Sequence, residues 1–141
     1  MASGVSKGSS GSPGKGRASV GFLLLCDAYS AVGGKDSLFN VFDRIFAKTF
    51  PAVHPKLYVV AEVLGAPDER RNLRLRFLDS SGNDVVPADE LNAVALSAFG
   101  SGRVVVEING LPIPRQGLFT FSLWEGDMRI GERTLYVERM G

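Results

Sequence analysis

The chain has 141 residues, 45% of them hydrophobic and 22% charged, which is typical of one soluble globular domain and excludes a disordered chain. A chain of this length can bury about two thirds of its surface without disulfides. The single cysteine, Cys26, and the single histidine, His54, exclude a disulfide framework and supply at most two ligands to a His/Cys zinc site.

The net charge of +1 conceals two unlike parts of the chain. Residues 1–20 are rich in Gly and Ser and carry Lys7, Lys15 and Arg17 with no acid, whereas the remainder has more acids than bases. A segment with so few apolar side chains cannot offset the entropy of ordering its backbone. The sequence therefore predicts a flexible basic arm over residues 1–20 and a single folded domain over residues 21–141.

The apolar run from Val20 to Cys26 follows basic residues, as the core of a secretion signal would. However, Asp27 ends the run without a small-residue cleavage site, and the run is far shorter than the ~20 residues that span a bilayer. We therefore interpret it as a buried first strand. We expect a cytoplasmic protein that makes no contact with a membrane.

A hairpin is predicted at the start of the domain. Residues 21–28 are apolar, a Gly-Gly pair follows as a turn signal, and residues 37–45 alternate between two faces. Pro51 and Pro55 disfavour the helical conformation in the residues that precede them. An extended connection is therefore expected after the hairpin.

The middle of the chain has the clearest strand patterns. Residues 57–64 are mostly apolar and β-branched, as in a central strand, and residues 71–79 alternate between apolar and polar side chains. A cluster of turn residues follows. Residues 85–86 are then predicted to form a short strand that Pro87 ends.

Residues 88–98 have two interpretations. Leu91, Val94 and Ala98 have helical spacing, and Asp89 is a suitable cap for a short helix. The same segment also fits an edge strand. We favour the first interpretation and predict at most one short helix here.

Three further strands are predicted over residues 103–111, 118–124 and 129–137. About seven or eight short strands joined by turns, without long helices between them, predict an all-β fold. The expected architecture is a two-sheet antiparallel β-sandwich, immunoglobulin-like or jelly-roll-like. A closed barrel is the alternative that the pattern leaves open.

Several motifs together resemble an uncharacterised bacterial family known only as a domain of unknown function. The resemblance covers roughly residues 21–138 and excludes the basic arm. It implies a small β-sandwich domain and transfers no catalytic residue. The segments that carry it are Phe22–Asp27, Gly34–Lys35, Asn40–Ile45, Phe50–Pro55, Asn109–Pro112 and the aromatic strand 118–123.

We expect no catalytic residue, no cofactor and no metal site. Cys26 ends an apolar strand and has no Cys-x-x-Cys partner, so we interpret it as a buried structural thiol. His54 lies between prolines and is interpreted as a structural histidine, although Asp43 or Asp27 could assist it as a general base. The turn over residues 79–84 resembles a calcium-binding loop but is equally typical of ordinary turns.

Arginines and outward apolar residues suggest an interaction surface. The arginines could bind an anion or nucleic acid, or they could form a solvated face with cross-strand acids. Leu118, Leu78 and Trp124 lie on faces that are predicted to point outward. Exposed apolar side chains of this kind are typical of a surface that binds a partner. The candidate residues for a partner or anion surface are Arg70, Arg71, Arg74, Arg76 and Trp124.

The sequence therefore favours a non-catalytic interaction or accessory module that acts through protein contacts, either with a partner or by self-association. The first alternative is a structural subunit of a larger assembly such as a phage-like particle, whose basic arm contacts neighbours or weakly binds nucleic acid. The second alternative is a small hydrolase that uses His54.

Overall fold

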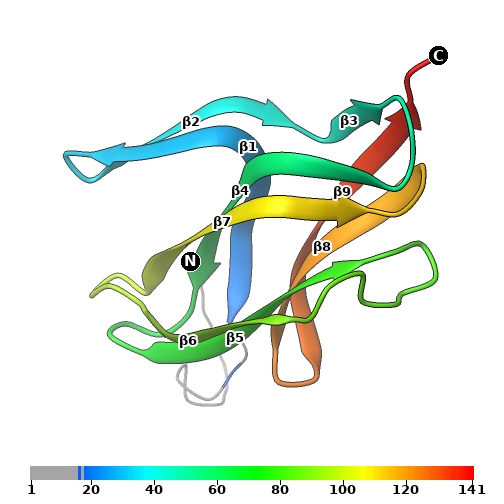
Figure 1. The fold of residues 1–141 in the computed structure, drawn as a ribbon. Helices are drawn as coiled ribbons and strands as arrows, with labels where there is room; N and C mark the ends of the chain where they lie inside the picture. The colour runs from blue at the N-terminus through cyan, green and yellow to red at the C-terminus, as the bar shows by residue number, and fades with distance from the viewer. Residues whose placement is uncertain (1–15, 17) are drawn as a thin grey trace.

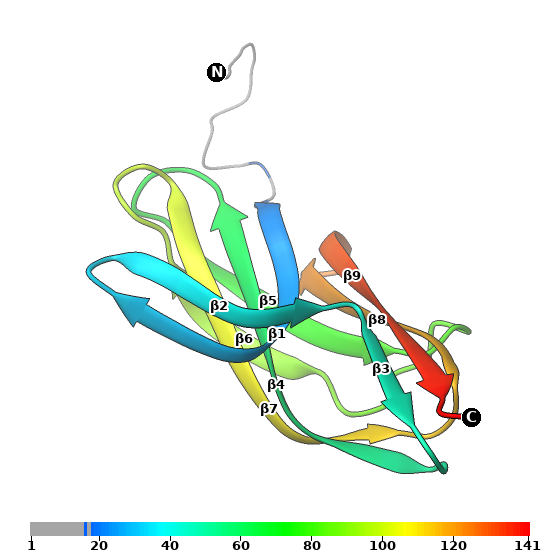
Figure 2. The ribbon, with the colours of Figure 1, turned by 90° about the horizontal axis from the view of Figure 1, so that it is seen from above.

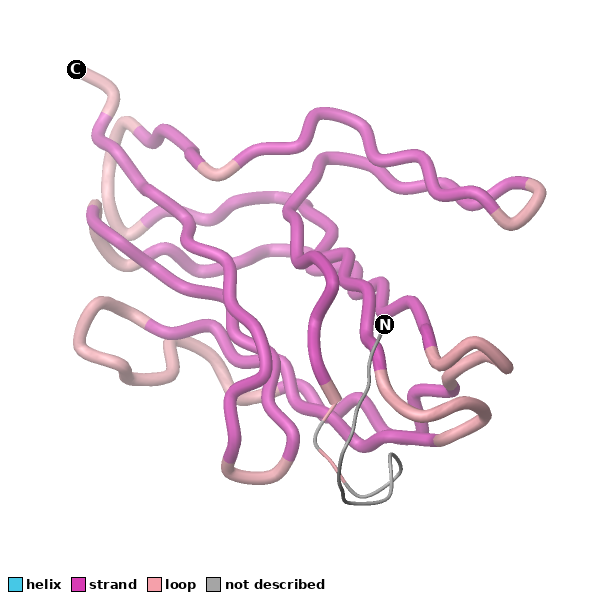
Figure 3. The backbone as a smooth tube through the Cα atoms, turned by 180° about the vertical axis from the view of Figure 1, so that it is seen from behind, coloured by secondary structure: helices cyan, strands magenta, loops and turns pink. Residues whose placement is uncertain are grey.

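The computed structural model describes residue 16 and residues 18–141, which form two β-sheets packed face to face (Figure 1). Figure 3 shows only strands and loops in this part of the chain. The strands are β1 (Ser19–Val32), β2 (Lys35–Phe42), β3 (Arg44–Ala47), β4 (Ala52–Leu64), β5 (Arg70–Leu78), β6 (Asp89–Ala95), β7 (Ser101–Ile113), β8 (Gly117–Glu125) and β9 (Met128–Arg139).

The sheets have four and five strands, in the orders β2-β1-β4-β7 and β3-β9-β8-β5-β6. Two separate sheets make this a sandwich and exclude the closed barrel, which confirms the predicted all-β sandwich. Neighbouring strands are antiparallel except β3 and β9, which pair in parallel. This parallel pair departs from the all-antiparallel prediction because the chain changes sheets between β2 and β3 instead of returning through a hairpin.

The helix predicted within residues 88–98 is wrong, because this segment contains the edge strand β6. Leu73 pairs with Leu91 and Arg71 pairs with Val94, so β6 has one extra residue between these two pairs. Such a bulge makes side chains three residues apart face the same side. Leu91 and Val94 therefore both pack against the core, and their spacing imitated that of a helix.

The core fills the space between the sheets with side chains from alternate strand positions. Phe77 lies at its centre, with its ring centroid 5.4 Å from that of Phe119 and 4.6 Å from that of Phe121. Leu73 and Leu75 share its face of β5 and are buried, as the alternation in residues 71–79 predicts. The burial of these large side chains is the main favourable contribution to folding.

Three predicted boundaries differ from the structure. Strand β4 begins at Ala52, earlier than the strand predicted over residues 57–64, so the extended connection expected around Pro55 is part of the sheet. No strand forms at residues 85–86; instead, the Val85 N–H donates to the carbonyl of Phe77 at 2.8 Å. The predicted arm over residues 1–20 falls mostly outside the described residues, and its last two residues begin β1.

The hairpin of β1 and β2 reaches across its own sheet. The first half of β1 pairs with β4 and the second half with β2, and in the view from above the hairpin crosses β4 and β7 so that its far end projects beyond β7 (Figure 2). Arg103 of β7 fixes it there, because its Nε donates to Asp36 Oδ2 at 2.7 Å. The Tyr29 hydroxyl donates to the other oxygen of Asp36.

Candidate interaction surface

Strand pairing brings three of the five predicted surface residues to one place. Arg74 lies opposite Trp124, and Arg76 lies opposite Ser122, on the neighbouring strands β5 and β8. Paired residues in antiparallel strands project from the same face. These four side chains therefore lie on the outer face of the five-stranded sheet, because Leu75 between the two arginines points into the core.

Contacts within this group hold its charges in place. The guanidinium of Arg76 lies 4.9 Å from the centroid of the Trp124 ring and donates from Nε and Nη2 to the two carboxylate oxygens of Asp84, each at 3.0 Å. The hydrogen bonds from Arg76 lower the pKa of the Asp84 carboxyl. The indole N–H of Trp124 donates to Ser122 Oγ at 2.8 Å. The charge of Arg76 is therefore compensated by Asp84, whereas Arg74 donates to the carbonyl of Gly126 at 2.8 Å.

Arg70 and Arg71 lie outside that group, at the beginning of β5. Arg71 is buried, and its guanidinium donates to Glu125 and Glu69, with closest distances of 2.7 Å to each. Those hydrogen bonds raise the pKa of Arg71 against the opposing effect of burial. Arg71 also donates to the carbonyl of Gly16 at 2.7 Å, so it ties the beginning of β1 to β5 and β8. Arg70 is exposed.

The other end of the same outer face was not predicted from the sequence. Arg44, Tyr136 and Leu118 lie side by side on β3, β9 and β8, and Phe46 follows two residues after Arg44. The Arg44 guanidinium is 5.5 Å from the Tyr136 ring centroid and donates to Glu138 at 2.9 Å. Tyr136 and Leu118 are each 42% exposed. Alternation could have placed Tyr136 outward, but nothing local predicts that β3 pairs with β9.

The two predicted outward leucines behave differently. Leu118 is exposed on the outer face, as expected. Leu78 is only 8% exposed, although it pairs with the outward Thr120, so its expected role in a partner surface is wrong. The turn that follows β5 folds back on Leu78, which forms a bridge with Asp84.

His54 lies at the opposite sheet, beside a shallow cavity of about 340 Å³. Asp27, Asn40 and Arg44 also line this cavity, and the His54 ring centroid is 5.9 Å from that of Phe42. Asp27 accepts a hydrogen bond from Asn40, and Arg44 is held by an acid on β9. The described residues that line the cavity supply no Ser, Thr or Cys nucleophile for the hydrolase alternative.

Hydrogen bonds to the Asp79 carboxylate stabilise the turn over residues 79–84. Asp79 Oδ1 accepts the N–H groups of Ser81 and Asn83 at 2.9 and 3.0 Å, and its other oxygen accepts from Arg115. These hydrogen bonds, first of all that from Asn83, lower the pKa of Asp79. Across the described part of the chain, no three His, Cys, Asp or Glu side chains group as metal ligands would.

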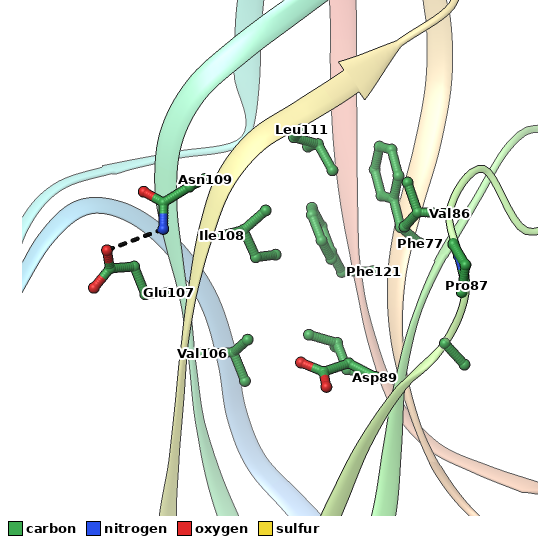
Figure 4. Close-up of a pocket in the computed structure, with 12 residues that line it drawn as sticks. Phe77, Val86, Pro87, Asp89, Val106, Glu107, Ile108, Asn109, Leu111 and Phe121 are labelled. Carbon is green, nitrogen blue, oxygen red and sulfur yellow. Dashed lines mark hydrogen bonds between the residues drawn. The ribbon is translucent and has the colours of Figure 1, made fainter.

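A second cavity, of about 330 Å³, opens between the two sheets beside β7 (Figure 4). Phe77 and Phe121 form its inner wall, Ile108 and Leu111 come from β7, and Val86 comes from the loop opposite. Asp89 and Glu107 also line it, and the Glu107 carboxylate points away from the cavity toward Asn109. The cavity therefore borders the core on this side of the sandwich, where Phe77 and Phe121 are 3% and 1% exposed, and no pattern in the sequence indicated it.

Cys26 is fully buried, as predicted for a structural thiol, and burial is the main cause that raises its pKa. Residues 16 and 18–141 contain no helix that is long and apolar enough to span a membrane.

Several solved structures of very different sequence are similar to this chain. An alkylpurine DNA glycosylase of Pseudomonas fluorescens, solved bound to DNA with an abasic-site analogue, is 10% identical, with a TM-score of 0.51. The match covers 86% of this chain but only 30% of the glycosylase. An immunoglobulin-like protein of Pseudomonas aeruginosa is 11% identical, with a TM-score of 0.48, over 87% of this chain and 98% of that one. The C-terminal domain of wzt is 13% identical, with a TM-score of 0.49, over 91% and 77%.

At 10% identity, the likeness to the glycosylase concerns the fold and no activity. No curated protein matches the chain. A family model matches residues 21–138, which confirms the resemblance found in the sequence: the chain belongs to DUF6941, a family of unknown function.

Proposed function

We propose that this protein is a non-catalytic interaction module that binds another protein through the outer face of its five-stranded sheet. The observation that carries the proposal is the pair of stacked arginine–aromatic groups on that face, Arg76 on Trp124 and Arg44 on Tyr136. Trp, Tyr and Arg are the residues most enriched among those that dominate binding energy at protein interfaces.

The face has the further properties of a protein interface. Phe46, Leu118 and Tyr136 supply exposed apolar area, and the hydroxyl groups of Thr120 and Ser122 separate them from the tryptophan. Because the arginines are already held in one geometry, a partner that packs against them loses less side-chain entropy on binding.

Charge compensation favours a protein over a nucleic acid as the ligand of this face. Asp84 pairs with Arg76, and Glu138 pairs with Arg44. Nucleic-acid affinity depends on several cations that are free to neutralise phosphates. The proposal places the module in the cytoplasm, as expected from the sequence.

The test is affinity capture from the source cells with three tagged baits: the unchanged chain, the double variant Trp124→Ala/Tyr136→Ala, and Phe39→Ala as a matched aromatic control. Phe39 is exposed on β2, which belongs to the other sheet. We expect the unchanged chain and the control to recover the same protein, and the double variant to bind it at least about tenfold more weakly in a calorimetric titration. Equal recovery by all three folded baits would exclude this face as the binding surface.

A further inference from the structure

Strand β7 is an unusually long free edge. It has 13 residues, pairs only with β4, and keeps one register from its first residue to its last. The other edge strands are shorter: β2 has eight residues, β3 has four, and β6 has seven with a bulge. An edge strand presents unpaired N–H and C=O groups that can pair with another strand, and proteins normally shorten, bend or charge such edges.

The charges on β7 are arranged so that the strand complements itself. Arg103 and Glu107 lie at equal distances on either side of Val105. If two copies of β7 paired in antiparallel fashion about Val105, Arg103 of each copy would lie directly opposite Glu107 of the other. A register centred on Glu107 would instead oppose two like charges. Opposite charges in facing positions stabilise a strand pair modestly, and like charges destabilise it, so these residues select a register.

Both charged side chains are already held in place. Arg103 donates to Asp36 and lies 3.6 Å from Glu62, and Glu107 accepts from Tyr58 and Asn109. The Arg guanidinium has five N–H donors, so these contacts leave it able to bind a further carboxylate.

A second observation supports the same register. Phe99 lies two residues before β7 and is 94% exposed, the most exposed of the large hydrophobic side chains described. Phe99 lies six residues before Val105, and Leu111 lies six residues after it. Leu111 and Ile108 line the apolar cavity beside β7 shown in Figure 4. Antiparallel pairing about Val105 would bring Phe99 of each copy level with this cavity in the other.

We infer that this protein forms a symmetric dimer in which β7 pairs antiparallel with β7 of a second copy about Val105, and Phe99 of each copy enters the cavity between the sheets of the other. The four-stranded sheets of the two copies become one continuous sheet. The contact is isologous, so it closes on itself and ends at the dimer. The dimer contact uses the edge of the four-stranded sheet, whereas the proposed protein-binding face lies on the five-stranded sheet. An experiment can therefore contradict either proposal without contradicting the other.

A cysteine scan of β7 tests the register. In the inferred dimer the two Val105 residues are cross-strand neighbours, with Cα atoms about 4.5 to 5.5 Å apart, which a disulfide can bridge. Val105→Cys is therefore expected to give a covalent dimer under mild oxidation. Glu107→Cys is the matched control on the same face, because the two copies of residue 107 would be offset by four residues, or about 13 Å.

Native Cys26 is fully buried and stays the same in both variants. A mixture of Arg103→Cys and Glu107→Cys is expected to cross-link only between the two different variants. Cross-linking of Glu107→Cys alone with the efficiency of Val105→Cys, or no cross-linking of Val105→Cys, would overturn the register.

Sedimentation equilibrium over a concentration series tests the dimer and the role of Phe99. We expect the unchanged chain to dimerise, Phe99→Ser to raise the dimer Kd at least about tenfold, and Val105→Lys, which opposes two like charges, to abolish association. Val53→Lys, exposed on β4, is the control that should leave the Kd unchanged. Circular dichroism melting confirms that each variant is folded.

A chain that stays monomeric at the highest attainable concentration would overturn the inference. A dimer that resists Phe99→Ser and Val105→Lys but is lost in Trp124→Ala/Tyr136→Ala would also overturn it, and would assign self-association to the outer face of the five-stranded sheet.

Discussion

The two long sides of the sandwich differ in how the core is covered. On one side the chain crosses from β2 to β3, and the Tyr136 N–H of β9 donates to the Asp43 carbonyl between those strands at 2.8 Å. Phe42 and Ile45 pack against the core there. On the other side β6 and β7 end their sheets as edges, and a cavity reaches Phe121. We call the side with β2 and β3 the closed side, because the chain itself covers the core there. We call the side with β6 and β7 the open side, because another molecule can add a strand to the sheet there.

The largest effect is expected from the ion-pair group that holds the segment before β1 against β5 and β8. Arg71→Ala leaves Glu69 and Glu125 without their buried cation, so we expect unfolding to cost about 3 to 5 kcal/mol less. Arg70→Ala, one residue earlier and exposed, should change the free energy of unfolding by less than about 0.5 kcal/mol. Urea denaturation of both variants measures the difference. Similar losses in the free energy of unfolding would show that the ion pairs of Arg71 do not stabilise the fold.

A pair of phenylalanines compares the two sides directly. Phe42→Ala on the closed side removes part of the core covering, with an expected loss of about 2 to 3 kcal/mol because the ring is only partly buried. Phe99→Ala on the open side should cost the monomer less than about 0.5 kcal/mol. Thermal and urea unfolding at a concentration low enough for monomers checks both values. Equal losses would contradict the distinction between a closed and an open side.

The smallest effect concerns the hairpin that crosses β7, and it depends on pH. Hydrogen bonds from Tyr29 and Arg103 lower the pKa of Asp36, so its ionised form stabilises the folded state. That contribution is fully present above the unfolded pKa of about 4 and is lost as the pH falls through the lower, folded pKa.

We therefore expect Asp36→Asn to lower the urea midpoint at neutral pH, and the two proteins to converge in strong acid. Val32→Asn, an exposed position in the same hairpin that carries no titratable group, is the control and should show no such convergence. If the midpoints of Asp36→Asn and the unchanged chain differed equally at all pH values, titration of Asp36 would not contribute.

Sequence reasoning succeeded where structure depends on local alternation. The clear pattern of β5 placed Leu73, Leu75 and Phe77 in the core and Arg74 and Arg76 on the outer face. It failed where the structure depends on pairing between strands that are far apart in the sequence. The bulge in β6 imitates helical spacing, because two residues oppose one across the strand pair.

The candidate surface was predicted in part for the same reason. Arg74, Arg76 and Trp124 belong to strands whose alternation is visible, so their common face could be predicted. Arg71 shares a strand with them but is buried by Glu125, which is 54 residues away in the chain. The contribution of Arg44 and Tyr136 depends on a parallel pairing across more than 90 residues, which no local pattern shows.

The pairing of β3 with β9 also bears on the order of events during synthesis. Residues 44–47 leave the ribosome long before residues 136–139, their partners in the sheet. Until β9 appears, β3 has no strand beside it, and the growing chain exposes apolar surface on both sides of the future sandwich. Contacts so distant in sequence form slowly because a long loop must close first. A nascent chain halted just before β9 is therefore the form of this protein most in need of a chaperone.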